Sequence, residues 1–285
     1  MATPNSDQIA HWNGARGESW VREQEARDRS LAPFGEAAIA RARPAAGERV
    51  LDIGCGCGAS TLAIAAAVGP GGAVLGVDVS TPMLARARER AAGFPAIQFA
   101  RADASTYAFD GSFDLAFSRF GVMFFDNPRA AFANLRRALR LTGRMAFVCW
   151  RSLEENHWMA VPFQAVREAF PSLPVPVWRG VPGPLAFADP DDVRRILSDA
   201  GFAAVQIEPF DHPMPLGDGG GLEAAAADAV TIGPTARLLA DADEATLDRA
   251  RQAVQRALRP HLKGTDVSLP GAAWVVSARA SPGRG

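Results

Sequence analysis

Lysine and tyrosine are nearly absent from this chain. Lys263 is the only lysine and Tyr107 the only tyrosine, so almost all positive charge is carried by arginine. The chain has 30 basic residues (Lys and Arg) and 31 acidic ones, which gives a formal net charge of −1. A balanced charge provides no field that would attract nucleic acid or an anionic lipid surface. We therefore expect neither nucleic acid nor a membrane among the partners.

Cysteine is also scarce, and long apolar runs are missing. Cys55, Cys57 and Cys149 are odd in number and too few for a disulfide framework, and the first two form only a C-x-C, so we expect no metal site. No apolar run approaches the roughly 20 residues that span a bilayer. Residues 1–10 lack the positive-then-apolar pattern of a secretory signal. These absences predict a cytoplasmic protein, with a disordered end at 281–285.

The chain does contain a regular alternation of strand-like and helix-like segments. Apolar runs rich in β-branched residues predict strands at 49–53, 73–79, 97–100, 113–118 and 144–150. Helical spacing, with its start and stop signals, predicts helices at 61–68, 82–92 and 128–140. This order predicts an α/β fold with a parallel, doubly wound sheet and crossover helices.

The flanking regions are less regular. Residues 5–43 are expected to be helical, and the proline-rich stretch 171–190 is incompatible with a continuous helix or a central strand. Further along, the pattern predicts a helix at 189–200, a strand at 205–210, mainly helix over 222–262 and a last strand at 273–278.

The strongest chemical signal is V-L-D-I-G-C-G-C-G at 50–58, in which a strand runs into a glycine-rich turn and then a helix. Glycines let the backbone approach a ligand, and the free N–H groups of a helix start favour an anionic group. Asp78 follows the second strand, where an acid can accept hydrogen bonds from ribose hydroxyls. Asp103 follows the third strand. Each acid alone also fits an ordinary surface or turn position. The glycine-rich turn, Asp78 and Asp103 are, however, all expected at the same edge of the sheet.

These residues resemble class I S-adenosylmethionine-dependent methyltransferases, most closely the quinone-biosynthesis type that acts on small molecules. Residues 50–61, 76–84 and 102–104 are similar to the first three motifs of that family, and 118–125 and 141–150 also have counterparts. The resemblance implies a Rossmann-like, seven-stranded sheet, mostly parallel with an antiparallel last strand. It also implies S-adenosyl-L-methionine as cofactor.

The resemblance assigns roles residue by residue. It implies that the cofactor contacts Gly54, Cys55 and Gly56 along the methionine, Asp78 on the ribose, Val79, Met83, Asp103 and Ala104 around the adenine, and Ser118 and Phe120 near the sulfonium. Phe120 fits a plain core position equally well. Ser118 and His157 are the candidates for catalysis, His157 being the best placed of the four histidines.

The resemblance also suggests a division of the chain. We expect an N-terminal helical cap (1–43), the cofactor-binding core (44–150), a substrate-facing insertion (151–188) and a C-terminal part of the core with a helical insertion (189–285). The segment from His11 to Trp20 could form a lid or simply pack. Aromatic residues of the insertion, namely Trp158, Phe163, Phe170 and Trp178, suggest a hydrophobic or aromatic acceptor.

The predicted reaction is methyl transfer to a small acceptor by in-line displacement, which needs no metal. One alternative is an NAD(P)-dependent oxidoreductase, but the turn reads G-x-G-x-G rather than G-x-G-x-x-G and no Tyr-x-x-x-Lys is present. The other alternative is a catalytically silent cofactor-binding partner subunit. A homodimer is compatible with the sequence.

Overall fold

The computed structural model describes residues 5–178 and 180–281, and the chain forms two compact units. Unit 1 comprises Met1–Cys149, Asp189–Phe210 and Trp274–Gly285, whereas unit 2 comprises Trp150–Ala188 and Asp211–Ala273. Apart from Ser281, the segment predicted to be disordered lies outside the described residues.

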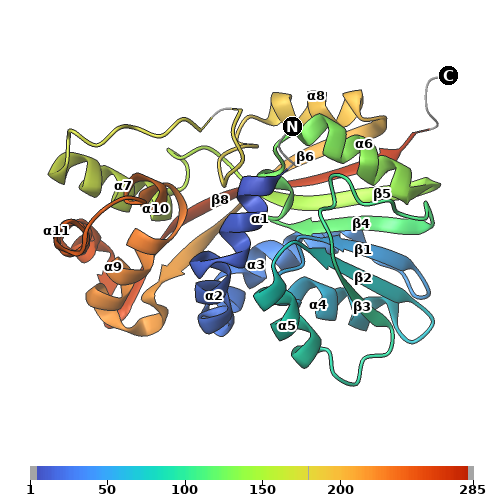
Figure 1. Cartoon of the computed structure of the whole chain (residues 1–285), viewed down its shortest axis with the longest axis horizontal. Helices are drawn as coiled ribbons and strands as arrows, with labels where there is room; N and C mark the ends of the chain where they lie inside the picture. The colour runs from blue at the N-terminus through green and yellow to red at the C-terminus, as the bar shows by residue number, and fades with distance from the viewer. Residues whose placement is uncertain (1–4, 179, 282–285) are drawn as a thin grey trace. The chain divides into compact units, whose positions relative to one another are not determined.

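Unit 1 contains the predicted parallel sheet, whose first five strands lie side by side in the order β3-β2-β1-β4-β5 (Figure 1). The strands are β1 (Arg49–Ile53), β2 (Ala73–Asp78), β3 (Ile97–Arg101), β4 (Phe113–Arg119) and β5 (Leu139–Trp150). Each neighbouring pair among them is parallel. β1 and β4 are the most buried of the first four, as expected for central strands with helices on both faces. The five strand predictions are confirmed.

Three of the four crossover helices begin at a side-chain cap. They are α4 (Ala59–Val68), α5 (Thr81–Arg90), α6 (Pro128–Ala138) and α8 (Pro190–Asp199). Ser80, Asn127 and Asp189 accept a backbone N–H from the first turns of α5, α6 and α8, and each is followed by a proline at an N-terminal helix position. A side-chain cap with an early proline satisfies orphan donors and presets the backbone.

The C-terminal strands complete the sheet as an antiparallel addition. β8 (Asp266–Ala280) lies between β5 and β6 (Phe202–Leu216), and the two-residue β7 (Leu262–Lys263) pairs with β8. Among the described residues, seven strands therefore form the main path of the sheet, the number that the resemblance implies, and β7 is an eighth beside β8. β6 is longer than predicted because it continues through Pro213 and Pro215, which an edge strand tolerates since half of its N–H groups need no partner.

The N-terminal region is helical, as predicted, but is divided into three helices. These are α1 (Ser6–Asn13), α2 (Ala15–Arg22) and α3 (Gln24–Ala42). Gly14 ends α1 with an extended backbone, and α2 then packs against α5 while α3 packs against β4. Phe34 of α3 is fully buried, so this segment is part of the core of unit 1.

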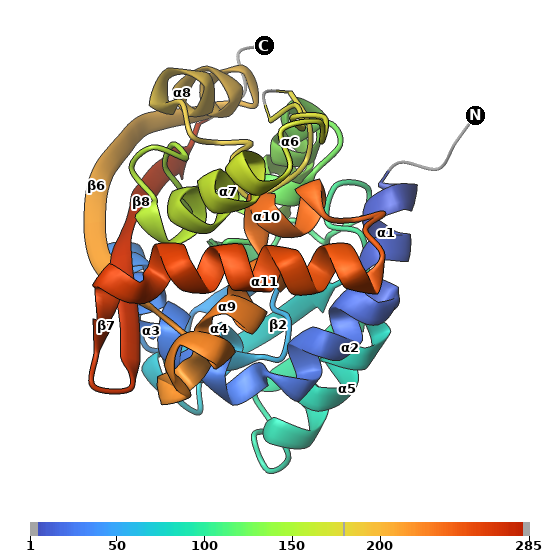
Figure 2. The ribbon, with the colours of Figure 1, turned by 90° about the vertical axis from the view of Figure 1, so that its left-hand side faces the viewer.

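Unit 2 is mainly helical. Its helices are α7 (His157–Ala169), α9 (Gly221–Thr231), α10 (Gly233–Leu238) and α11 (Glu244–Leu258). Figure 2 shows α11 beside α7 and α9. The helical prediction for 222–262 is confirmed, whereas no helix was predicted over the residues of α7, which contains Pro162.

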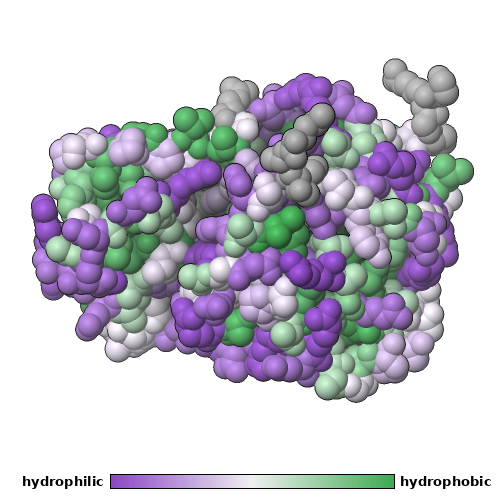
Figure 3. Space-filling view, in the orientation of Figure 1, coloured by the Kyte–Doolittle hydropathy of each residue, from purple (hydrophilic) through white to green (hydrophobic). Residues whose placement is uncertain are grey.

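The surface drawn in Figure 3 intersperses hydrophilic residues with small apolar patches. Within the described residues, no helix has the length and apolar character required for crossing a membrane.

Candidate cofactor site

The glycine-rich turn after β1 is tightly built. Gly54 and Gly56 have φ values of 64° and 55°, in the left-handed region that favours glycine. A Cβ on Gly54 would lie 2.8 Å from the Cα of Gly121, so a second chain segment crosses here with no room for a side chain. The Gly54 N–H donates to the carbonyl of Val77 on β2 (2.8 Å), which fixes the turn against the neighbouring strand.

Asp78 is joined directly to this turn. The backbone N–H of Gly56 donates to Asp78 Oδ2 (2.8 Å), and that of Ser80 donates to Oδ1 (2.8 Å). Burial raises the pKa of the Asp78 carboxyl, and the backbone hydrogen bonds partly oppose that shift. Two independent sequence signals, the glycine turn and the acid of the second strand, therefore meet within hydrogen-bond distance.

Asp103 lies beside Asp78 at the same edge. The N–H of Ala102 donates to the carbonyl of Asp78 (3.0 Å), which carries β3 into the turn that holds Asp103. Ala104 is buried, and its carbonyl accepts a hydrogen bond from Asn134 Nδ2 of α6 (2.9 Å). The carboxyl ends of β1, β2 and β3 thus bring together the predicted cofactor-binding residues, as the parallel order requires.

Asp52 is a residue of this edge that the sequence interpretation did not single out. Its side chain is fully buried, and its Oδ2 accepts hydrogen bonds from the hydroxyls of Ser60 (2.8 Å) and Thr61 (2.6 Å). Its Oδ1 is buried without a hydrogen-bond partner among the described residues. Burial raises the pKa of Asp52 to about 6. Its place two residues before Gly54 was the available signal.

The two cysteines of the turn are buried side chains with unreactive thiols. Burial raises the pKa of Cys55 well above its usual value and that of Cys57 to about 12. A Cβ on Gly76 of β2 would lie 3.0 Å from Cys55 Sγ, so this side chain packs against the sheet. The thiols therefore fill space, and only the backbone of Cys55 is suited to line the turn.

Ser118 and Phe120 lie where β4 ends. The Ser118 hydroxyl donates to the carbonyl of Ile53 (2.8 Å) and accepts the N–H of Gly121 (3.1 Å), so it holds the ends of β1 and β4 together. Phe120 has a φ of 62°, rare for a residue with a side chain, and its buried ring packs edge-on against Phe34. This geometry gives Ser118 a positioning role, and its catalytic role stays a prediction.

The N-terminal helices reach the same edge of unit 1. The Ser80 hydroxyl donates to the carbonyl of Trp12 (2.7 Å), and the Trp12 ring meets Phe124 edge-on. The Asn13 side chain donates to the carbonyl of Val79 (2.9 Å) and accepts the N–H of Thr81 (3.0 Å). Trp12 and Asn13 thus contact residues near the predicted adenine position, which fits both packing and the lid alternative.

The aromatic residues of the insertion have packing partners within unit 2. Trp158 lies 5.1 Å from Trp150 and Phe163 lies 5.8 Å from Trp178, measured between ring centroids, and Arg249 covers Phe170. Each of these side chains thus has a packing partner, Phe170 and Trp178 are only half-buried, and the hydrophobic or aromatic acceptor stays a prediction. His157 begins α7 with an exposed side chain, and its role as a base stays a prediction.

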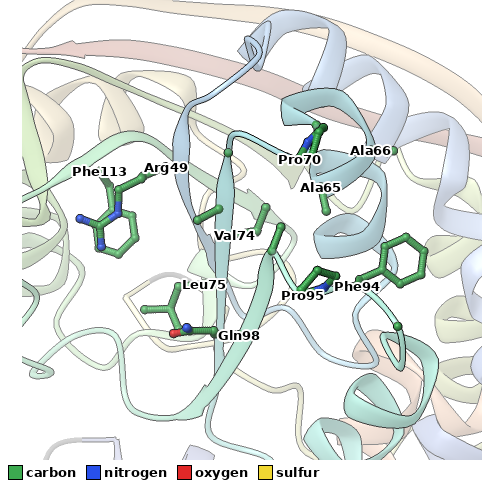
Figure 4. Close-up of a pocket in the computed structure, with 15 residues that line it drawn as sticks. Arg49, Ala65, Ala66, Pro70, Val74, Leu75, Phe94, Pro95, Gln98 and Phe113 are labelled. Carbon is green, nitrogen blue, oxygen red and sulfur yellow. The ribbon is translucent and has the colours of Figure 1, made fainter.

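A surface hollow of about 600 Å³ lies at the opposite, amino-terminal edge of the sheet (Figure 4). It is lined by the starts of the strands and the loops before them, including Arg49, Val74, Phe94, Pro95 and Gln98. Open α/β sheets bind ligands beyond the carboxyl ends of their strands. Position therefore favours the edge with Asp78 and Asp103 as the cofactor site.

Asn134 supports the turn after β3, and we expect Asn134→Ala to lower the free energy of unfolding by about 1–2 kcal/mol. Its Nδ2 donates to the carbonyls of Ala104 (2.9 Å) and Tyr107 (2.8 Å), which the variant leaves without this donor. Urea unfolding measures the change. The control Arg137→Ala removes only the contact to Asn134 Oδ1 and should change stability less; equal losses would contradict the expectation.

Comparisons with known proteins agree with this arrangement. Residues 50–143 match a family model described as a methyltransferase domain. An aklanonic acid methyltransferase of a Streptomyces species is 38% identical over 118 residues, which cover 40% of this chain and 54% of that protein. A demethylmenaquinone methyltransferase of Clavibacter sepedonicus is 40% identical over 103 residues, covering 36% and 41%.

A solved structure shows the same fold over most of the chain. Phosphoethanolamine N-methyltransferase 2 of Haemonchus contortus is 21% identical, with a TM-score of 0.53 and coverage of 88% of this chain and 53% of that one. The chain matches about half the length, or less, of these curated relatives. The predicted motifs and the strand order coincide with the segment, residues 50–143, that is similar to a methyltransferase domain.

Proposed function

We propose that this chain transfers the methyl group of S-adenosyl-L-methionine to a small organic acceptor. The observation that carries the proposal is the 2.8 Å hydrogen bond between the Gly56 N–H and Asp78 Oδ2, with Asp103 on the adjoining strand end. The same three elements hold the ribose, adenine and methionine parts of the cofactor in the family that the motifs resemble. The H. contortus structure is, by its title, a complex with S-adenosyl-L-methionine.

The residues present fit such a ligand. Gly54 and Gly56 leave the turn without side chains, and the unpartnered buried Oδ1 of Asp52 suits a ligand that carries positive charge. In the proposal Asp78 accepts from the ribose, Asp103 from the adenine amino group, and Val79, Met83 and Ala104 flank the base. Gly54, Cys55, Gly56, Ser118 and Phe120 border the methionine.

The cofactor supplies a methyl group already activated by its sulfonium. The protein's task is then to align the acceptor with the methyl carbon and to exclude water. Ser118 and the strained Phe120 fix the shape of this edge between β1 and β4, which is the kind of over-determined backbone found at sites of function. The names of the relatives include two small-molecule methyltransferases, which supports a small acceptor here.

Titration calorimetry tests the cofactor and labelled transfer tests the reaction. We expect S-adenosyl-L-methionine and S-adenosyl-L-homocysteine to bind with one site per chain, and NADH not to bind. A screen of small acceptors with methyl-labelled cofactor should then give a labelled product. Binding of NADH in place of the adenosyl ligands would refute the proposal, and cofactor binding without transfer to any acceptor would favour a silent partner subunit.

A further inference from the structure

Asn5, the residue before α1, is held by polar groups from two separate turns of the carboxyl edge. Its Nδ2 donates to Asp103 Oδ1 (2.9 Å) and to Ser105 Oγ (3.2 Å). Its Oδ1 accepts the N–H of Asp126 (2.7 Å), and its own N–H donates to Asp126 Oδ2 (2.6 Å). Asn5 therefore ties the start of α1 to the turn after β3 and to the segment after β4.

The left-handed backbone conformation of Asn5 is stabilised by these hydrogen bonds and not by α1. Asn5 has a φ of 56°, which asparagine tolerates better than most residues, and it is only 4% exposed. A buried amide is stable when its donors and acceptor are satisfied, and here the side chain has a partner at each end. Hydrogen bonds away from water are also stronger.

The contact leaves one oxygen of Asp103 available. Both hydrogen bonds to the Asp103 carboxylate, from Asn5 Nδ2 and from the N–H of Ser105 (2.9 Å), end on Oδ1. Oδ2 accepts none from the described part of the chain. Two donors on one oxygen fix the plane of a carboxylate, so the second oxygen is presented in one orientation.

We infer that Asn5 is a positioning residue for recognition of the cofactor's adenine. It holds Asp103 through Oδ1, so that Oδ2 accepts the exocyclic amino group, and it shields that hydrogen bond from water. The inference rests on the proposed function. It makes the selectivity for an amino-bearing base depend on a residue in front of α1, far in sequence from the three cofactor motifs.

The test compares two ligands that differ at the base. S-adenosyl-L-homocysteine carries the amino group, whereas S-inosyl-L-homocysteine carries a carbonyl there. Calorimetry should show that Asn5→Ala raises the dissociation constant of the adenosyl ligand about tenfold, as for a weakened charge-assisted hydrogen bond. The inosyl ligand, measured by competition, should change by less than about twofold because it has no exocyclic amino group to donate to Asp103.

Three further variants separate this role from simple packing. Asn5→Asp keeps an acceptor for the Asp126 N–H but replaces the donor with a carboxylate oxygen facing Asp103, so its selective loss should be at least as large as that of Asn5→Ala. Asn13→Ala loosens the other end of α1 and should affect both ligands equally. Ser6→Ala, whose hydroxyl lies 3.5 Å from Asp7, should affect neither.

The outcomes are distinct. An equal loss for both ligands in Asn5→Ala, or no loss at all, overturns the inference, and so does a selective loss in Asn13→Ala. Wild-type protein that binds neither adenosyl ligand would instead refute the proposed function. Thermal unfolding of each variant checks that the fold is retained.

Discussion

Asp78→Asn should weaken the binding of S-adenosyl-L-homocysteine by about 1.5–3 kcal/mol, the range for a lost charge-assisted hydrogen bond. Asp78 has two tasks in the proposed site. It would accept from the ribose, and it already accepts the N–H of Gly56 (2.8 Å), which keeps the glycine turn in place. An amide in its place retains one acceptor atom and loses the charge. Calorimetry on folded variant protein measures the effect.

Asp114→Asn is a matched control for this prediction. Asp114 of β4 also accepts a backbone N–H, that of Arg49 (2.9 Å), but it does so at the amino-terminal edge of the sheet. We expect its substitution to leave the dissociation constant of the adenosyl ligand unchanged. If Asp78→Asn binds as tightly as wild type, the ribose assignment is wrong.

Asp52→Asn should raise the free energy of unfolding by about 1–3 kcal/mol near pH 8. Burial raises the pKa of Asp52 from 3.8 to about 6, so the folded protein prefers the protonated acid. The stabilisation from this preference is fully present below pH 3.8 and is lost as pH rises through about 6. Asparagine imitates the neutral form at every pH, although its NH₂ group gains no partner at the Oδ1 position.

The pH dependence distinguishes this effect from a change in packing. The difference between variant and wild type should shrink as pH falls from about 8 towards 4, and urea unfolding at several pH values measures it. The hydroxyls of Ser60 and Thr61 can still donate to the amide oxygen of the variant. The charges of Arg119 and Asp78 also act on the pKa of Asp52, the first lowering it and the second raising it. A destabilised variant at pH 8 would show that the ionised carboxylate is favourable even without ligand.

Glu48→Gln provides the opposite sign as a control. The hydrogen bond from Arg144 lowers the pKa of Glu48, so its contribution to stability is present at neutral pH and lost on acidification. The variant should therefore be less stable than wild type near pH 8, and the difference should disappear in acid. Parallel curves for the two variants would contradict at least one of the two assignments.

The sheet of unit 1 could be predicted because local and tertiary signals agree there. Runs such as Val50–Ile53 are apolar, rich in β-branched residues and bounded by glycine, and a proline such as Pro82 marks the start of a helix. Elsewhere the signals conflict. α7 contains Pro162, and β6 continues through Pro213 because an edge strand needs fewer N–H donors.

The candidate site shows the same division. Gly56, Asp78 and Asp103 could be placed because each ends or follows a strand of a parallel sheet, and topology alone brings such residues together. Asn5 could not, since it lies 98 residues from Asp103 in a segment without a motif. Contacts of this kind depend on where a helix packs, and a helical pattern does not specify that.

The chain leaves unit 1 along β6 and returns to it along β8. β6 passes from unit 1 into unit 2 after Phe210, and β8 returns at Trp274, and these two strands are neighbours in the sheet. A segment that leaves and re-enters on adjacent strands can be lengthened, shortened or exchanged with no change in strand order. Variation between residues 211 and 273 can thus change unit 2 while the strand order that brings Gly54, Asp78 and Asp103 together stays the same.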